Sequence, residues 1–421
     1  MVAEPFRTYS KIKEIADNYF KTLVEVSKKG NPVIWGPADI PYEILRAMDI
    51  YYVLGEPYGS MWAARGMAGE LLPATENFGF KTCFCAYSRN FIGSYLTGKS
   101  PLEKLPRASF MVAVKAGCND HIAWFEALSR IEKTPFFALD LPFSYSDPSE
   151  RHIQYVQRQL ENLVDFLERM TGRKMVEERL VKAVINAHKL RELWSNILEK
   201  LKNSPVPLNF RNQSSFMVAA VWLKGSDEAI EAYSSLLDEL EDRIEKGIPA
   251  VTDEKVRLLW DNVPVWFYLK LFSYLESKGL ILVVSPYMLG WGDINFIYSQ
   301  YPQHVKDLFC WKTPETASDA LRETAKQLLR IQLTTNSLDS KIHIYEAIAR
   351  DYHVNGAIFH SNSGCKPLSL NRIEVARHLE KTLQIPVLVF ESSMADPSGF
   401  NEVGILSQIN KFATFFETRI K

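Results

Sequence analysis

Residues 359–370 read FHSNSGCKPLSL and decide which fold the chain is expected to adopt. The apolar run that leads into them, Asn355 to Phe359, consists of β-formers without polar alternation, as is typical of a buried parallel strand. Turn-forming residues follow from Ser361 to Gly364, and helical spacing begins at Leu370. Cys365 is therefore expected between the carboxyl end of a strand and a helix, where open α/β sheets bind ligands.

Two interpretations of Cys365 fit this local sequence. Backbone amides at the start of the next helix would lower the pKa of its thiol and favour a metal-bound thiolate. A loop cysteine without a chemical role would have the same neighbours. The stretch alone leaves both open, so the rest of the chain has to decide.

The composition predicts a globular protein of two or three domains. A chain of 421 residues and 48.2 kDa is too long for one ordinary core, and its 47% hydrophobic and 24% charged residues are typical of soluble proteins. The net charge of -1 gives no footprint for nucleic acid or anionic membranes. The sequence has neither a signal-peptide core at its start nor a transmembrane run, so we expect a cytoplasmic protein that binds neither nucleic acid nor membrane.

Short apolar runs with strand character alternate with helical patterns in both halves of the chain. They lie at residues 31–36, 51–55, 110–114 and 135–139, and again at 258–260, 280–284, 357–359 and 386–390. This alternation predicts an α/β fold with parallel sheets and right-handed crossovers. Residues from about 147 to 246 have helical periodicity almost throughout.

The expected organisation is two parallel-sheet domains, Rossmann- or flavodoxin-like, with a helical segment between them. The boundaries are residues 1–146 for a first α/β domain with a leading helix, 147–250 for the helical segment and 251–421 for a second α/β domain. The third strand of each half is followed by a Gly-Cys pair, Gly117-Cys118 and Gly364-Cys365. If both sheets turn their carboxyl edges toward one interdomain cleft, these cysteines can face each other there, although two such pairs also arise by chance.

The five cysteines do not form a disulfide framework or a local metal motif. Their number is odd and no CxxC pair occurs, which excludes a zinc ribbon and a thioredoxin-type site. Cys85 precedes a helical segment and, given Cys118 and Cys365, is interpreted as a ligand. Cys83 is expected to be a buried small hydrophobe. Cys310 follows a helical stretch and is interpreted as structural or spare.

Three cysteines on three separate loops suit a [4Fe–4S] cluster better than zinc. Such a cluster needs four terminal ligands and usually takes thiolates, so three thiolates leave one iron open for water or substrate. Zinc would be expected to recruit histidine, and no histidine pair has metal-ligand spacing in the sequence.

Four segments, in this order along most of the chain, together resemble the 2-hydroxyacyl-CoA dehydratase family, which also includes benzoyl-CoA reductase subunits. They are CAYSRNFIGSYLTGK at 85–99, GCND at 117–120, SNSGCKPLSL at 361–370 and FESSMADPSGF at 390–400. The resemblance implies that Cys85, Cys118 and Cys365 ligate a [4Fe–4S] cluster whose fourth site is not a protein thiolate. It also implies three partners: a homologous second subunit or a second copy of the chain, an ATP-dependent iron–sulfur activator protein and an acyl-CoA substrate.

The function that the resemblance predicts is that of the iron–sulfur subunit of a radical (R)-2-hydroxyacyl-CoA dehydratase, an anaerobic hydro-lyase that forms a 2-enoyl-CoA. The thioester carbonyl does not acidify the β-hydrogen that must leave. One electron on the carbonyl gives a ketyl radical anion, which expels the neighbouring hydroxyl and acidifies that hydrogen. The cluster would carry the electron, and its open iron would act as a Lewis acid. The chain has no GxGxxG or P-loop motif, so it is not expected to hydrolyse ATP itself.

Glu56, at the end of the second predicted strand, is the candidate catalytic acid or base for the hydroxyl or the β-proton. The family's activating subunit has a glutamate in a similar place, although an exposed loop carboxylate would have the same local sequence. The family often has a serine in the turn after the first strand. Here that turn is Gly36-Pro-Ala-Asp39, so the role is absent or passes to Asp39. Tyr287 and Trp291 fit packing positions better than the wall of an acyl or CoA channel.

Two other functions remain open on the sequence. A reductase of the same family would act on an aromatic acyl-CoA or carry a double-cubane cluster, and the latter needs about six thiolates whereas the chain has five cysteines. A metal-free α/β binding protein would be colourless after anaerobic purification.

Overall fold

The computed structural model describes residues 4–100, 105–115, 118–142, 148–293, 303–333 and 337–420. Gly117 of the first Gly-Cys pair lies outside these residues, as does the expected domain boundary after residue 146.

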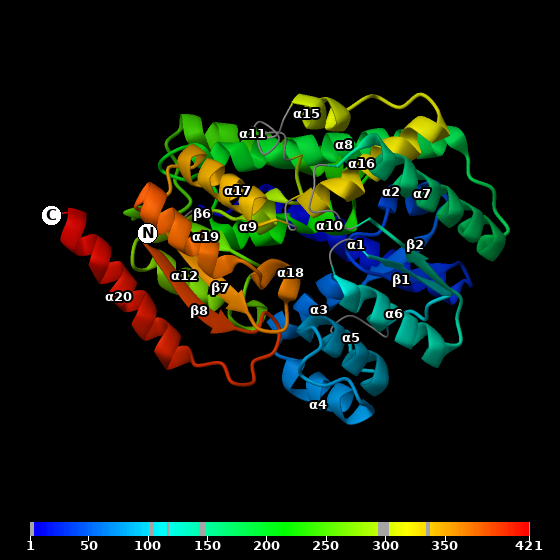
Figure 1. The fold of residues 1–421 in the computed structure, drawn as a ribbon, viewed down its shortest axis with the longest axis horizontal. Helices are drawn as coiled ribbons and strands as arrows, with labels where there is room; N and C mark the ends of the chain where they lie inside the picture. Colours follow the sequence, from blue (N-terminus) through cyan, green and yellow to red (C-terminus); the bar gives the residue numbers. More distant parts are fainter. Residues whose placement is uncertain are drawn as a thin grey trace.

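In the described part of the chain, eight strands form two four-stranded parallel sheets (Figure 1). The first sheet has the order β2-β1-β3-β4 and consists of β1 (Val33–Gly36), β2 (Tyr51–Leu54), β3 (Phe110–Val114) and β4 (Phe136–Leu139). The second has the order β6-β5-β7-β8 and consists of β5 (Val256–Asp261), β6 (Leu280–Val284), β7 (Gly356–Asn362) and β8 (Val387–Ser392). The predicted α/β class and all eight predicted strands are confirmed, and the two sheets have the same strand order.

The strands are apolar runs because helices cover both faces of each sheet. Every residue of β3 and of β6 is buried, which leaves no face that would require polar alternation. The edge strands β4 and β8 are only partly buried. The sequence patterns were therefore clearest for the strands that are buried throughout.

Helices connect the strands within each half. Those of the first half are α1 (Thr8–Lys28), α2 (Tyr42–Ala47), α3 (Gly55–Ala64), α4 (Ala68–Phe78), α5 (Ala86–Thr97) and α6 (Asn119–Glu132). Those of the second half are η2 (Trp266–Tyr268), α12 (Lys270–Glu276), α13 (Pro286–Leu289), α15 (Gln303–Phe309), α16 (Ala317–Leu333), α17 (Leu338–Asp351), α18 (Lys366–Ser369), α19 (Arg372–His378), the π-helical turn η3 (Leu379–Leu383) and α20 (Glu402–Ile420).

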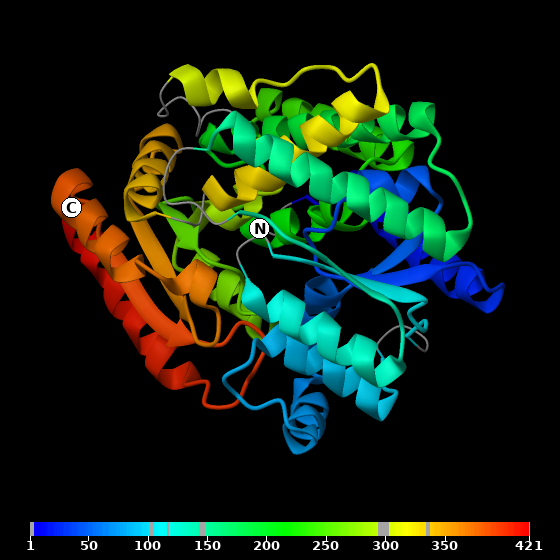
Figure 2. The ribbon, with the colours of Figure 1, turned by 45° about the vertical axis from the view of Figure 1, so that its right-hand side comes forward.

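A layer of helices follows the first sheet in the chain. It contains α7 (Glu150–Thr171), α8 (Glu177–Glu199), η1 (Lys200–Lys202), α9 (Phe210–Phe216), α10 (Val218–Trp222) and α11 (Asp227–Glu245). Of the apolar residues that predict one face of α7, Val164 is half-buried and the others are buried: Ile153, Val156, Leu160, Leu163 and Leu167. Figures 1 and 2 show the long green helices of this layer, α8 and α11, toward the top of both views, and Figure 1 shows α9 and α10 nearer the centre.

Two helices from outside this segment complete the layer. α16 packs on α7, where Arg322 Nη2 lies 2.7 Å from Glu150 Oε2. α1 packs on α11, where Thr8 Oγ1 donates to Glu239 Oε2 at 2.6 Å. The layer is therefore assembled from the start, the middle and the second half of the chain. None of the described helices combines the length and the apolarity that a membrane crossing requires.

His360 on β7 is a fully buried histidine whose two ring nitrogens each lie 3.0 Å from a backbone carbonyl oxygen, that of Val263 or Ser392. Burial lowers its pKa to about 4, although the carbonyl contacts oppose this shift. Between pH 6.5 and 4 the unfolded chain therefore binds a proton that the folded chain excludes. The free energy of unfolding consequently falls as the pH falls through this window.

For His360 alone, we expect this loss of stability to approach about 1.4 kcal/mol per pH unit. Chemical denaturation of the cluster-free protein at pH 7, 6 and 5 measures how steeply the free energy of unfolding changes with pH. In His360→Asn this slope should be smaller, by an amount that corresponds to up to one bound proton. His188, whose pKa burial also lowers to about 4, stays in the variant and keeps its own contribution. Equal slopes for the wild type and the variant would contradict the prediction.

Candidate active site

Three cysteines lie at the N-terminal ends of helices and line one cavity of about 490 Å³. Cys85 is the residue before α5, Cys118 the residue before α6 and Cys365 the residue before α18. All three are free thiols in the described structure. The cavity wall also includes residues that follow β1 and β5, such as Ala38 and Val263, so both halves of the chain build it.

The position of the cavity follows from the strand order of the two sheets. In each sheet the chain leaves the first strand toward one side and returns on the other side, so β1 and β3 are neighbours, as are β5 and β7. Their connections diverge at the carboxyl ends and leave a crevice, the usual ligand site of an open parallel sheet. Cys118 follows β3 and Cys365 follows β7 at these equivalent points.

The turn that delivers Cys365 depends on Gly364, whose φ of +82° lies in the left-handed region that favours glycine. The segment after the turn is held by its neighbours. Ser369 Oγ donates to the carbonyl of Asn362 at 2.9 Å, and Lys341 Nζ donates to the carbonyl of Leu370 at 3.0 Å. These contacts fix the direction of the Cys365 side chain relative to β7.

The thiols are less acidic than their helix-start positions predicted. Burial raises the pKa of Cys365 to about 11 and outweighs the opposing backbone amide of Leu368. Burial also raises the pKa of Cys85, and the Cys365 and Cys118 thiols add to that shift by charge repulsion. The expectation of a lowered pKa is wrong for the metal-free chain, because the sequence reveals the helix amides but not the depth of burial.

The donor set fits a cationic group larger than one ion. The three thiols share a cavity and repel one another when ionised, and an added positive charge would relieve that repulsion. Among the described residues, however, no three His, Cys, Asp or Glu side chains are close enough to hold a single metal ion. A metal cluster contains several metal ions, and each of them can bind one thiolate. Three thiols spread around a cavity therefore suit a cluster better than a single ion.

Cys83 and Cys310 take no part in this arrangement. The prediction that Cys83 is buried is wrong, because it lies exposed in the turn between α4 and α5. Cys310 is also exposed and directly follows α15. Both lie outside the cavity wall that the described residues form.

Residues of the CAYSRN segment bind the second half of the chain through three hydrogen bonds. The hydroxyl of Tyr87 accepts from Trp266 Nε1 at 2.5 Å, and Asn90 Nδ2 donates to the carbonyl of Ala395 at 2.9 Å. Arg89 Nη2 lies 2.5 Å from Asp396 Oδ2, and both side chains are almost fully buried. These contacts join the first α5 turns, which begin at Cys85, to the loop after β8.

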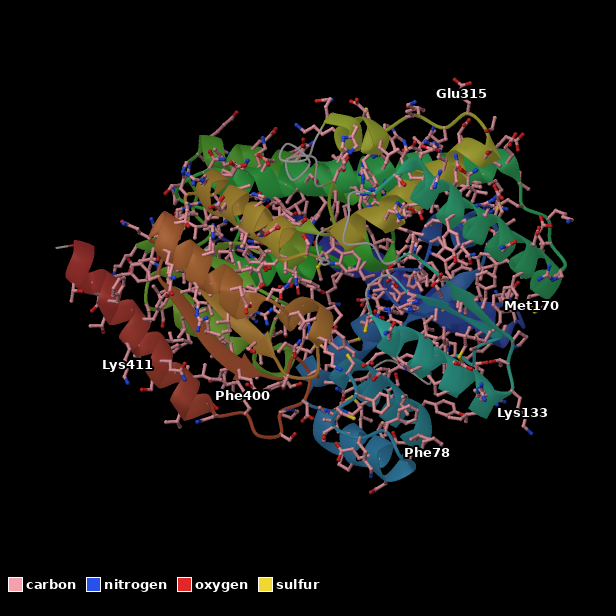
Figure 3. The ribbon with its side chains drawn as sticks, viewed as in Figure 1. Phe78, Lys133, Met170, Glu315, Phe400 and Lys411 are labelled. Carbon is pink, nitrogen blue, oxygen red and sulfur yellow. The ribbon has the colours of Figure 1, made fainter. Side chains whose placement is uncertain are left out.

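The loop after β8 is itself anchored to the second sheet. The ring of Phe400, labelled in Figure 3, packs at a tilt 4.8 Å from that of Tyr268 and edge-on 5.1 Å from that of Phe267, measured between ring centroids. Met394 N donates to Asn362 Oδ1 at 3.1 Å, at the end of β7. The segments 85–99 and 390–400, recognised separately in the sequence, therefore form one connection between the halves.

Replacing Asp396 with asparagine should destabilise the protein by about 3 kcal/mol, because it leaves the buried Arg89 guanidinium with one carboxylate fewer. Glu76→Gln is the matched control, since Glu76 pairs with the same arginine at 2.7 Å but its side chain is 35% exposed. Its cost should stay below about 1 kcal/mol. Denaturation midpoints of the two variants measure the difference, and equal costs would contradict the assignment.

Glu56 lies on the cavity wall in the first turn of α3, directly after β2. Its side chain is 16% exposed, so the alternative of an exposed loop carboxylate is wrong. Oε1 lies 2.9 Å from His121 Nε2, and Oε2 accepts a hydrogen bond from Ala38 N at 3.0 Å. Two donors from different elements thus fix the orientation of this carboxylate.

His121, one turn after Cys118 on α6, is the residue that the sequence analysis missed. Burial lowers the pKa of His121, but the neighbouring Glu56 and Asp39 carboxylates outweigh burial and raise it well above its usual value. The two carboxylates therefore favour the protonated form of the ring. The sequence did contain a signal for His121. It directly follows the GCND segment and lies three residues after Cys118, and residues three apart on a helix share a face.

Asp39, in the turn after β1, completes the group. Its Oδ1 lies 3.7 Å from His121 Nδ1, and among the described residues neither atom has a hydrogen-bond partner. Burial raises the pKa of Asp39 to about 7, although His121 opposes the shift. Asp39 and His121 both line the cavity.

Tyr287 and Trp291 also line the cavity, both only partly buried. Both side chains also pack against the hydrophobic core, as predicted, so they combine a packing position with a place in the cavity wall. Tyr287 follows β6 on α13, at the same carboxyl edge as the Cys365 turn. Burial raises its pKa, so it carries a neutral hydroxyl.

Comparisons with known proteins cover nearly the whole chain. Residues 37–417 match the family described as 2-hydroxyglutaryl-CoA dehydratase, D-component. The chain is 26% identical over 394 residues to the alpha subunit of (R)-phenyllactyl-CoA dehydratase from Clostridium sporogenes, covering 93% of this chain and 91% of that subunit. It is 24% identical over 414 residues to the alpha subunit of (R)-2-hydroxyisocaproyl-CoA dehydratase from Clostridioides difficile, covering 97% and 96%. It is also 24% identical over 417 residues to a benzoyl-CoA reductase subunit from Thauera aromatica, covering 96% and 93%.

Proposed function

Because the chain belongs to the 2-hydroxyglutaryl-CoA dehydratase D-component family, we propose that it is the iron–sulfur subunit of a radical (R)-2-hydroxyacyl-CoA dehydratase. The relatives from Clostridium sporogenes and Clostridioides difficile are dehydratase subunits, so the chain is a lyase of the hydro-lyase class. Their names as alpha subunits imply a partner subunit. The reaction removes water from a 2-hydroxyacyl-CoA and gives a 2-enoyl-CoA.

The convergence of Cys85, Cys118 and Cys365 on one cavity is the observation that carries this proposal. These thiolates would hold a [4Fe–4S] cluster, which supplies an electron and an open iron for a substrate oxygen. Three thiolates would leave the fourth iron of such a cluster without a protein thiolate.

Glu56 and His121 transfer the protons of the reaction. Elimination breaks the C2–O bond and the C3–H bond and forms the C2–C3 double bond. Glu56 takes the proton from C3, and His121 Nε2, 2.9 Å from Glu56 Oε1, exchanges protons with it. The same pair returns a proton to the departing hydroxyl, so water leaves and both residues end in their starting state. Ala38 N holds the second carboxylate oxygen throughout.

The apolar part of the wall excludes water from these steps. Met217, Val218, Val221 and Trp222 come from the α10 region, and Trp266 comes from the second half of the chain. A dry cavity strengthens the interactions of the Glu56–His121 pair and protects a reactive intermediate.

The experiment is anaerobic reconstitution of the chain with its partner subunit and an ATP-dependent iron–sulfur activator protein. Iron analysis should give about four irons for this chain. Assays with a panel of 2-hydroxyacyl-CoA thioesters should give the 2-enoyl-CoA without net reduction. Iron-free, colourless protein would overturn the proposal and leave a metal-free binding protein.

A reductase is the second candidate, because the chain is also similar to the benzoyl-CoA reductase subunit from Thauera aromatica along almost its whole length. The same assay separates the two functions, since a reductase adds two electrons to an aromatic acyl-CoA and releases no water. A double-cubane cluster disagrees with the cavity, because Cys83 and Cys310 lie outside the wall that the described residues form.

A further inference from the structure

Two tyrosines of the cavity wall, Tyr87 and Tyr287, each lie beside a tryptophan of the same wall. Tyr87 is in the first turn of α5, and its hydroxyl accepts a hydrogen bond from Trp266 Nε1 at 2.5 Å. Tyr287 is in α13, and the indole N–H of Trp291 is close enough to its hydroxyl to oppose the rise of its pKa that burial causes. An indole N–H donates and never accepts, so the direction of both contacts is fixed. The proposed function assigns no role to these four side chains.

Each of the two hydroxyls has a proton that no described residue accepts. The contact with Trp266 is the one hydrogen bond of the Tyr87 side chain among the described residues, although Tyr87 is only 7% exposed. A buried tyrosine ordinarily donates to a protein oxygen, as Tyr233 does to the carbonyl of Phe216 at 2.9 Å. Burial raises the pKa of Tyr87 and of Tyr287, so both keep their protons. What both hydroxyls offer to the cavity is therefore a donor.

A missing acceptor is not by itself a binding site. The hydroxyl of Tyr352 is also buried without a partner among the described residues, but it is not part of the cavity wall that these residues form. The cavity tyrosines differ in two respects. Each is oriented by an indole, and the two lie close enough together that an ionised Tyr287 would repel an ionised Tyr87. Two donors that converge from the two halves of the chain suit one shared acceptor atom.

The tyrosine pair lies between the groups that the proposed function assigns to the reaction. Burial raises the pKa of Tyr287, and the nearby Glu56 carboxylate adds to the rise. Burial likewise raises the pKa of Tyr87, and the nearby thiols of Cys85 and Cys365 add to that rise. An acyl chain with its C3 at Glu56 and an oxygen toward the thiols would therefore place its first carbons beside the two hydroxyls.

A thioester carbonyl oxygen is the acceptor that two donors fit. This oxygen has two lone pairs and no proton. A substrate hydroxyl would bring a proton of its own, and a phenol oxygen that already accepts from an indole is a poor acceptor for it. Negative charge on the carbonyl oxygen is stabilised by donors that are oriented before the reaction, in a cavity whose apolar wall excludes water.

We propose that Tyr87 and Tyr287 donate hydrogen bonds to the thioester carbonyl oxygen of the substrate and form an oxyanion hole, in which Trp266 and Trp291 orient the two hydroxyls. The inference rests on the proposed function, because that function supplies the acyl-CoA thioester. In this arrangement Tyr87 and Tyr287 are catalytic residues, and the two tryptophans are positioning residues.

Infrared spectroscopy of a bound, unreactive thioester tests the inference. The probe is butyryl-CoA labelled with ¹³C at its carbonyl, which has no hydroxyl to eliminate and stays intact on the anaerobically purified protein. Hydrogen bonds weaken the C=O bond, so its stretching frequency should fall on binding to the wild type. About half of this shift should be lost in Tyr87→Phe and in Tyr287→Phe, and nearly all of it in the double variant. Spectra are compared at equal iron content, because iron bound to the oxygen would lower the frequency as well.

Calorimetry with S-butyl-CoA, the thioether that lacks the carbonyl, gives a second readout. The wild type should bind butyryl-CoA about 10- to 100-fold more tightly than S-butyl-CoA, and each single variant should reduce this preference about three- to tenfold. The affinity for S-butyl-CoA should stay the same in both variants, whereas a general loss of packing would weaken it. Tyr95→Phe is the matched control on α5, because Tyr95 donates to Glu132 and is not part of the cavity wall that the described residues form. Its carbonyl band and both affinities should equal those of the wild type.

Trp266→Phe tests the orienting role of the indole. The Tyr87 hydroxyl remains in this variant but is free to turn, so the carbonyl band should broaden. An unchanged band would exclude that role for Trp266. An unshifted band in the wild type, a full shift in the double tyrosine variant, or equal affinity of the wild type for the two ligands would each overturn the inference as a whole.

The inference and the proposed function fail in different ways. Binding of butyryl-CoA requires no turnover, so a protein with the tyrosine-dependent shift that dehydrates no 2-hydroxyacyl-CoA contradicts only the proposed function. A dehydratase whose bound carbonyl is insensitive to both tyrosines contradicts only the oxyanion hole.

Discussion

Replacing Cys365 with alanine is expected to remove the iron and the dehydratase activity together. The variant retains two of the three cavity thiols, too few to hold a cube that already lacks a fourth protein ligand. Iron and acid-labile sulfide should fall from about four per chain to near zero, and activity should fall below about 0.1% of the wild type. Visible absorbance and metal analysis measure the first effect, and the enoyl-CoA assay measures the second.

Cys310→Ala and Cys83→Ala are the controls for this prediction. Both cysteines are exposed outside the cavity wall that the described residues form, so both variants should keep wild-type iron and activity. The far-ultraviolet circular dichroism of all three variants should be alike, because each removes one side-chain sulfur. A full cluster in Cys365→Ala, or equal loss of iron in Cys310→Ala, would show that the three cavity thiols are not the ligand set.

Replacing Glu56 with glutamine is expected to lower kcat about 10²- to 10⁴-fold while the iron content stays the same. The amide keeps the size of the carboxylate but cannot accept the C3 proton, and its Nε2 cannot accept the hydrogen bond from His121. KM should change little, because Glu56 acts on the reacting carbons and does not bind the CoA moiety. Anaerobic kinetics with iron analysis of the same sample separate loss of catalysis from loss of the cluster.

Glu126→Gln is the matched control on a neighbouring element. Glu126 lies on α6, the helix of His121, but its side chain is 40% exposed and pairs with Arg130 four residues later. Its kcat should equal that of the wild type. If Glu56→Gln also turned over at the wild-type rate, another group would have to take the proton, and His121→Gln would then identify whether the imidazole does so.

The sequence was sufficient for the sheets because parallel strands covered on both faces are continuous apolar runs. It also placed Cys85 and Cys365 near helix starts and Cys118 after the third strand of the first half. The pairing of Arg89 with Asp396 could not be predicted, because it joins two segments that are distant in the chain. The strand at 356–362 carried no hint that both ring nitrogens of His360 would lie 3.0 Å from carbonyl oxygens while the side chain is fully buried.

Charges within the helical layer were the hardest to predict. Arg191 lies on α8 among buried apolar residues, and helical periodicity alone would assign a long basic side chain there to the solvent. The helix that carries Arg191 is contacted by α16, which joins the layer from the second half of the chain. The acidity of the thiols was misjudged for the same reason, since burial is a property of the assembled fold.

The order of the thiols along the chain has a consequence for biogenesis. More than half of the polypeptide lies between Cys118 and Cys365. As the protein leaves the ribosome, the first two thiols emerge long before the third, so an inorganic core bound by all three can be inserted only after translation is nearly complete. Once in place it would act as a cross-link that closes a very long loop, and apoprotein lacking it should be the form most exposed to proteases.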